Sequence, residues 1–92
     1  MTTIKLSESE PSIMIFDANV LELFKKYASY RIPVSWIDKI ELTTDKKGKH
    51  DLEIHSLHTS GTNGYTVDEN AFQKVTQLIA EIERAKAVFN FD

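Results

Sequence analysis

The residues whose type and spacing most readily suggest chemistry are six cations. Three flank an early connection between expected strands and three occupy a later turn: Lys25, Lys26, Arg31, Lys46, Lys47 and Lys49. Ammonium and guanidinium groups form charge-assisted hydrogen bonds with phosphate oxygens, so this set could hold an anionic lipid headgroup or another phosphorylated ligand. Lysines in exposed turns also keep a chain soluble and discourage pairing at sheet edges. We take that solvated role as the ordinary explanation and a phosphate site as its alternative.

The three histidines raise the question of a metal site, because imidazole is a common metal ligand. They are His50, His55 and His58. On a regular strand, Glu53 and His55 would share one face and His58 would point to the opposite face. Two ligands do not make a metal site, so we predict partly exposed histidines, no metal and no cofactor.

Carboxylates and hydroxyls near these histidines do not form a recognisable catalytic set. The candidates on paper are Ser35, Asp38, Glu41, Asp51, Glu53 and Ser56. Catalysis needs a nucleophile held by a base and an orienting group in a sheltered cleft, and closeness in sequence supplies none of these. We therefore predict that the protein is not an enzyme and has no catalytic residues.

All of these residues must be positioned by a single domain, because 92 residues can build one core but not two. A net charge of -3 argues against a dedicated nucleic-acid binder. The sequence has no cysteine, which excludes disulfides, thiolate catalysis and cysteine zinc sites. It has no apolar run as long as a signal peptide or a bilayer-spanning helix, so we expect a cytoplasmic protein.

The clearest element is a helix from Asp68 to about Asn90. Its apolar residues recur at steps of three and four: Phe72, Val75, Leu78, Ile79, Ile82, Ala85 and Phe89. A single amphipathic helix is marginal in water, so this stripe must be buried against a sheet built by the preceding residues. Thr66 and Glu69 have the spacing of a capping box, and Asp68 is an alternative cap, so the helix start is marked to within two residues.

The strongest strand signals lie in the middle of the chain. Residues 39–43 and 51–55 each alternate polar and apolar side chains, on either side of a turn at 45–49. Gly48 lies in this turn and can adopt a positive φ. We expect an antiparallel hairpin with one buried face, formed by Ile40, Leu42, Leu52 and Ile54.

Two further signals are local. Asn63-Gly64 is typical of a two-residue hairpin turn, so residues 65–67 would form a short last strand. Trp36 lies among apolar neighbours, and we expect it in the core rather than exposed as an anchor for a partner.

The first third of the chain leaves one alternative open. Residues 3–7 alternate weakly, like a short edge strand, and the apolar run 13–16 is typical of a strand buried on both faces. Residues 20–24 could form a strand that follows a hairpin turn at 17–19. Alternatively, Asp17 or Asn19 caps a helix over residues 18–29. The shared face of that helix would be Val20, Phe24 and Tyr27.

Taken in order, these segments resemble the small bacterial pleckstrin-homology-like (PH-like) domains. In that family a strand pair around a phenylalanine-aspartate-x-asparagine motif precedes an isoleucine-proline segment, an apolar strand, further hairpins and one closing helix. The matching residues here are Ile15-Phe16-Asp17-Ala18-Asn19, Arg31-Ile32-Pro33-Val34-Ser35-Trp36-Ile37, Ile40-Glu41-Leu42 and the helix from Asp68. The likeness covers the chain from Ile13 onward.

The resemblance implies an α+β fold that is mostly β, with residues 1–92 as one PH-like domain. It would be a bent antiparallel barrel or sandwich of about six or seven strands, capped by one C-terminal helix, with residues 20–24 as a strand. The implied function is binding without catalysis, to a protein partner or to further copies of the chain.

Three functions therefore stay open. The first is association with protein, for which an unpaired edge strand and an apolar tail of Val88, Phe89 and Phe91 are the expected surface. The second is peripheral binding of anionic lipid or a phosphorylated ligand through the six cations. The third is a small α+β enzyme of an unrecognised type.

Overall fold

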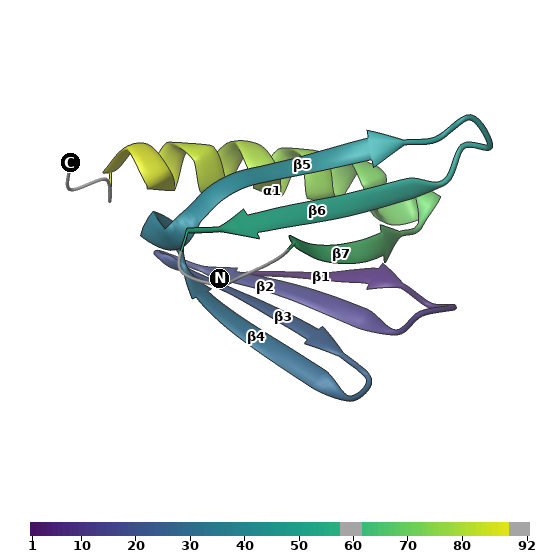
Figure 1. Ribbon diagram of the computed structural model, residues 1–92, viewed down its shortest axis with the longest axis horizontal. Coiled ribbons are helices and arrows are strands. Elements are labelled where there is room, and N and C mark those ends of the chain that lie inside the picture. The colour runs from purple at the N-terminus through teal and green to yellow at the C-terminus, as the bar shows by residue number, and fades with distance from the viewer. Residues whose placement is uncertain (58–61, 89–92) are drawn as a thin grey trace.

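The computed structural model describes residues 1–57 and 62–88, and within them the chain forms seven strands and one long helix (Figure 1). The elements are β1 (Thr2–Ser7), β2 (Ser12–Asp17), β3 (Val20–Lys25), β4 (Ala28–Pro33), the short 3-10 helix η1 (Val34–Trp36), β5 (Ile37–Thr44), β6 (His50–Ser56), β7 (Thr62–Val67) and α1 (Glu69–Val88). Two antiparallel sheets have the strand orders β1-β2-β3-β4 and β5-β6-β7. The predicted class, α+β and mostly β with one C-terminal helix, is confirmed.

The segment between residues 17 and 30 contains two strands, which resolves the open alternative in favour of β structure. In β3 the buried residues Leu21 and Leu23 alternate with more exposed ones, and this period of two is that of a strand. A helix would have needed Tyr27 on its buried face. Tyr27 is instead 89% exposed, in the turn between β3 and β4.

The β2–β3 turn places one alanine in an unfavourable backbone conformation. Asp17 pairs with Val20, so only Ala18 and Asn19 connect the two strands. Ala18 has a φ of 58°. For a residue with a Cβ atom this left-handed conformation costs about 1 kcal/mol, and glycine adopts it without that cost.

The strand β2 is buried on one face only, so the prediction of burial on both faces is wrong. Met14 and Phe16 point into the core, whereas Ile13 is 39% exposed. Ile13 lies directly opposite Phe24 of β3, and these two apolar side chains cover each other on the outer surface of the sheet. The apolar run 13–16 therefore does not indicate that a second layer covers the outer face of β2. Its outward residue Ile13 is partly covered by Phe24 of the neighbouring strand instead.

The β5–β6 hairpin forms as predicted, with Ile40 opposite Ile54 and Leu42 opposite Leu52. Its turn is held by the carboxylate of Asp45, which accepts hydrogen bonds of 2.9 Å from the backbone N–H groups of Lys47 and Lys49. The same turn contains Gly48 with a φ of 83°, the positive value expected there.

The prediction of a hairpin turn at Asn63-Gly64 is wrong, because both residues lie inside β7. They pair with Ile54 and Glu53 of β6, which gives the backbone of that strand its hydrogen-bonding partners. A turn at this position would have left those groups unpaired. Tyr65 continues the ladder and is buried in the core.

The helix start is tied to the first sheet. Thr66 belongs to β7, so no capping box forms between Thr66 and Glu69, and α1 begins directly after Asp68. The backbone N–H of Asp68 donates to the carbonyl of Leu6, and its carboxylate accepts a hydrogen bond from the N–H of Glu8. These contacts fix the end of β1 beside the start of α1.

The apolar stripe of α1 is buried, as predicted. Val75, Leu78 and Ile82 are at most 1% exposed, and Phe72, Ile79 and Ala85 are partly buried. Ala71, which the predicted stripe did not include, is buried as well, with 3% of it exposed. The helix packs on β1, on β5 and on η1, so it spans from one sheet to the other (Figure 1). Phe89 lies outside the described residues.

The strained turn leads to a prediction about stability. Ala18→Gly should raise the free energy of unfolding by about 1 kcal/mol in urea denaturation, because it removes the steric cost of the left-handed conformation. Ala28→Gly, at an exposed position of β4, is the matched control and should lower it by about 0.5–1 kcal/mol. A loss of stability in Ala18→Gly equal to that of the control would contradict this interpretation.

Candidate functional site

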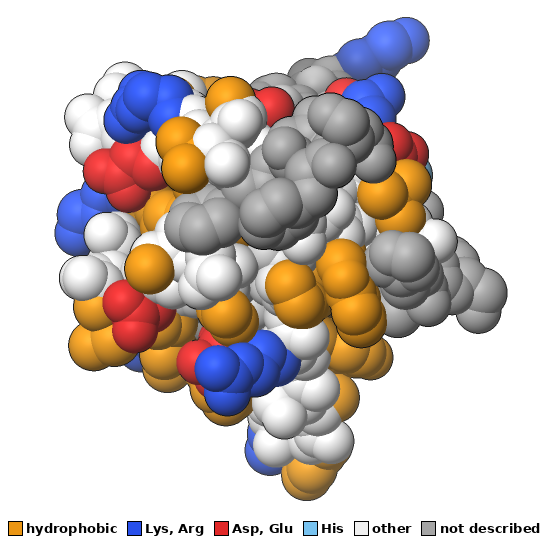
Figure 2. Space-filling view, turned by 90° about the vertical axis from the view of Figure 1, so that its left-hand side faces the viewer, with side chains coloured by type: hydrophobic (Ala, Val, Ile, Leu, Met, Phe, Trp, Pro, Cys, Tyr) orange, Lys and Arg blue, Asp and Glu red, His pale blue; other side chains and the backbone are white. Residues whose placement is uncertain are grey.

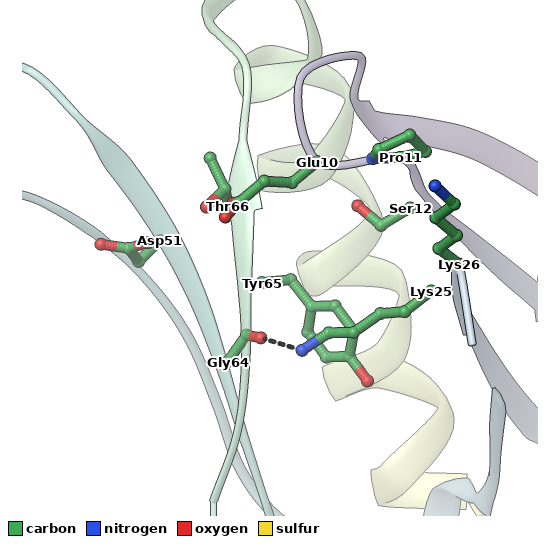
Figure 3. A pocket seen from close by; sticks show the side chains of 9 residues that line it. All are labelled: Glu10, Pro11, Ser12, Lys25, Lys26, Asp51, Gly64, Tyr65 and Thr66. Carbon is green, nitrogen blue, oxygen red and sulfur yellow. Dashed lines mark hydrogen bonds between the residues drawn. The ribbon is translucent and has the colours of Figure 1, made fainter. Parts of the chain in front are cut away.

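The first functional candidate is a cleft of about 340 Å³ between the two sheets (Figure 3). It lies where β7 faces the β1–β2 turn and the end of β3. Its lining residues are Glu10, Pro11, Ser12, Lys25, Lys26, Asp51, Gly64, Tyr65 and Thr66.

Lys25 bridges the two sheets across this cleft. It pairs with the buried Ser12 on the inward face of the first sheet. Its Nζ donates a hydrogen bond of 2.9 Å to the carbonyl of Gly64 and lies 4.5 Å from the centre of the Tyr65 ring (Figure 3). The charge of Lys25 is therefore engaged by β7, through a carbonyl and a cation–π contact.

The structure brings together only two of the six predicted cations at this cleft. Lys25 and Lys26 line it, whereas Arg31 lies on β4, and Lys46, Lys47 and Lys49 belong to the β5–β6 turn. Glu10 and Asp51 line the same cleft, so two carboxylates oppose the two ammonium groups. A balanced lining is a poor match for a multiply charged phosphate, which several cationic donors stabilise.

Tyr65 is the most perturbed ionisable group among the described residues. Its side chain is buried, with 3% of the residue exposed, and its hydroxyl has no hydrogen-bond partner in the described part of the chain. Burial, and after it the neighbouring Tyr30, raises the pKa of Tyr65 to about 12. The sequence showed Tyr65 only as a residue of the last strand, because the contacts that perturb it come from another sheet.

His50 corrects the expectation of partly exposed histidines, since only 8% of it is exposed. Its Nδ1 lies 2.7 Å from the Thr44 hydroxyl, its Nε2 contacts the Glu69 carboxylate, and its ring lies 4.3 Å from that of Phe72. These contacts join the start of β6 to the start of α1, which is a structural role. The sequence contained the information needed to predict this burial, because His50 is two residues from the buried Leu52 on one strand and therefore points to the same face.

A second group of ligating side chains lies on the outer face of the β5–β6 hairpin. Glu41, Glu53 and His55 place one ligand atom each within 4.8 Å of the others. Sequence proximity identified Glu53 and His55 but not Glu41, which the ladder brings opposite Glu53. Exposed acidic groups commonly gather without a metal, and Lys39 already pairs with Glu41 at 3.5 Å. This group alone does not define a metal centre, and His58 lies outside the described residues.

The remaining acid and hydroxyl candidates are not gathered in one place. Ser35 and Asp38 line a groove near the end of α1, Asp51 lines the cleft between the sheets, and Glu41 and Glu53 are on the outer hairpin face.

That groove, of about 370 Å³, lies where η1 and β5 meet the last turns of α1. Lys86 borders it and donates from Nζ to the carbonyl of Asp38 at 3.3 Å. Trp36 is 41% exposed, so its expected place in the core is wrong: it lies in η1, where Val34 supplies the buried side chain. Figure 2 shows this end of the molecule, with hydrophobic side chains between charged ones.

The expected apolar tail can be followed only in part. Val88 is 74% exposed at the end of α1, and Phe89 and Phe91 lie outside the described residues. Across residues 1–57 and 62–88, no helix combines the length and the apolar character needed to cross a bilayer.

Comparisons with protein-family models, with curated proteins and with solved structures find no match to this chain.

The buried phenol leads to a prediction about pH. At neutral pH, Tyr65→Phe should be at least as stable as the wild type, because an unpartnered buried hydroxyl costs about 1–3 kcal/mol. As pH rises above the ordinary pKa of 10.0, the unfolded chain loses the Tyr65 proton first, while the folded chain keeps it up to about 12. The wild type therefore loses stability across this window, by at most about 2–3 kcal/mol, and the variant lacks that loss.

The measurement is the difference in free energy of unfolding between Tyr65→Phe and wild type at pH 8 and at pH 11. It should be larger at pH 11. A difference that is the same at both values would contradict the raised pKa.

Proposed function

We propose that this protein is a non-enzymatic, PH-like binding module that works by associating with protein, in the first place with a second copy of itself. The family assignment draws support from the order of the elements, with two antiparallel sheets followed by one closing helix. It also draws support from the motif residues. Phe16-Asp17 end β2, Ala18-Asn19 connect it to β3, and Ile32-Pro33 end β4 before η1.

The observation that carries the proposed association is the concentration of exposed apolar side chains around the β3–β4 hairpin. Phe24 is 36% exposed, Tyr27 89% and Tyr30 42%, and Ile13 at 39% lies beside Phe24. Ile13 and Phe24 lie on the outer face of the sheet, whereas Tyr30 shares the face of the buried Leu23, so the exposed apolar side chains lie on both faces of the hairpin. Single exposed apolar residues are ordinary on a protein surface, but several on one projecting hairpin favour it as the place of contact with a partner. Ile13 and Phe24 also line a shallow groove of about 200 Å³.

The alternative of an anionic lipid or phosphorylated ligand draws support from Lys25 and Lys26, which line one cleft. Two features weigh against it. Lys25 is engaged by Gly64 and Tyr65, and the cleft carries as many carboxylates as ammonium groups. A cytoplasmic location stays a prediction from the sequence.

The proposal predicts a mass that depends on concentration. Sedimentation equilibrium between about 1 µM and about 1 mM should show a rise above the monomer mass of 10.5 kDa. Tyr27→Ser should raise the dissociation constant about tenfold, because it removes a large apolar side chain from the contact. Leu57→Ser, at a residue 61% exposed and distant in sequence from this hairpin, is the control and should leave the mass unchanged.

A mass of 10.5 kDa at every concentration would overturn the proposed association. Sedimentation with anionic vesicles at two salt concentrations tests the alternative. Binding that is lost at high salt and weakened by Lys26→Glu would favour a lipid or phosphate ligand instead.

A further inference from the structure

The strand β4 is an open edge of the first sheet. It pairs with β3 on one side, and none of the other described strands pairs with it on the other (Figure 1). Its residues from Ala28 to Arg31 are all exposed. An edge of this kind presents backbone donors and acceptors to which a further strand can be added.

The hydrogen-bond pattern shows which β4 residues point outward. Val34 N–H donates to the carbonyl of Asn19 at 2.7 Å, immediately beyond the Val20–Pro33 pair. Because bonded and non-bonded pairs alternate along an antiparallel ladder, the pairs that bond to β3 are those of Ile32, Tyr30 and Ala28. Ser29 and Arg31 therefore direct their N–H and C=O groups away from β3.

The backbone of Pro33 faces away from β3, as the backbones of Ser29 and Arg31 do, because these residues alternate along the strand. Its missing N–H is thus one that would have faced the free edge, so the proline costs the sheet no hydrogen bond. It does end the run of outward donors. The usable edge consists of Ser29 and Arg31, with one donor and one acceptor each.

We propose that β4 pairs antiparallel with β4 of a second copy, about a two-fold axis on which Tyr30 faces Tyr30. This assignment rests on the proposed function and names its partner and its register. Ser29 of each copy then lies opposite Arg31 of the other, and the two pairs exchange four backbone hydrogen bonds. The two four-stranded sheets become one continuous sheet.

Neighbouring registers of the same parity are worse. Moving the strands one way places Arg31 opposite Arg31, with like charges facing each other, and brings Pro33 opposite Ser29, where it has no N–H to donate. Moving them the other way places Ser29 opposite Ser29 and leaves Arg31 opposite a turn residue. Only the register centred on Tyr30 uses every outward donor and acceptor of Ser29 and Arg31.

The same register gives the exposed apolar side chains of β4 and of the β3–β4 turn apolar partners, which is the reason to name a second copy as the occupant. Tyr30 faces Tyr30 of the second copy, Ala28 lies opposite Ile32, and the exposed ring of Tyr27 lies opposite Pro33. The cation of Arg31 lies opposite an uncharged serine, and Glu22 stands beside it on β3 of its own copy. The edge is therefore complementary to itself in hydrogen bonding, in apolar contact and in charge.

The first test removes an outward N–H without touching the fold. Arg31→Pro deletes a donor that the monomer does not use, as Pro33 already does, and should raise the dissociation constant about tenfold or more through two lost bonds per dimer. Arg31→Ala keeps the backbone donor and is the matched control, with an expected change of less than about threefold. Equal losses in both variants would show that the arginine side chain, not the strand edge, holds the copies together.

The second test determines which residues of the two β4 strands face each other, and it does not require that Arg31→Pro folds. The chain has no cysteine, so a single introduced one reports on one position. Residues that face each other in a non-hydrogen-bonded pair have Cα atoms about 4.5 Å apart, within the range of a disulfide. Tyr30→Cys should therefore form a covalent dimer on mild oxidation, much faster than Arg31→Cys or Val88→Cys.

The outcomes separate this inference from the proposed function. A mass that rises with concentration but is insensitive to Arg31→Pro, with no preference for cross-linking in Tyr30→Cys, would overturn the β4 dimer and leave self-association standing. A mass that continues to rise past twice 10.5 kDa would overturn the two-fold pairing. A wild type that stays monomeric would overturn both.

Discussion

Burial of one apolar stripe of α1 is the interaction on which the rest of the structure depends. Val75, Leu78 and Ile82 are at most 1% exposed, and the helix that carries them packs on strands of both sheets. Fully burying one such side chain contributes about 1.5–3 kcal/mol, so the three supply about 5–9 kcal/mol. The whole stability of a small domain is of the same size, about 5–15 kcal/mol. The two sheets, of four and three strands, therefore depend on this helix for a large part of their stability.

The placement of the helix also explains why function is expected at β4. The helix lies on β1 and β5, and Asp68 and His50 fix its start to β1 and β6. This arrangement covers one side of the space between the sheets and leaves β4 uncovered on the other (Figure 1). The hairpin that carries Tyr27 and Tyr30 therefore projects from the core. Its edge strand stays open because the helix covers the other side of the space between the sheets.

Sequence periodicity predicted those elements whose buried face is long enough to repeat. The α1 stripe and the β5–β6 hairpin were evident for this reason, whereas β3 was too short to be distinguished from a helix. The error at Asn63-Gly64 arose because a local turn signal was outweighed by pairing with β6. The site was less predictable still. Lys25 was identified as a cation, but its contacts with Gly64 and Tyr65 depend on how two sheets meet, and no local pattern contains that information.

Native-state hydrogen exchange at increasing urea tests most directly whether the helix is integral to the fold. If burial of its stripe holds the two sheets together, the amides of Val75, Leu78 and Ile82 should open with the same free energy as those of Leu52 and Ile54 in β6. Both groups should also respond to urea with the same slope. Helix amides that open at clearly lower free energy, while β6 stays protected, would show that the sheets are stable without α1 and would contradict the account.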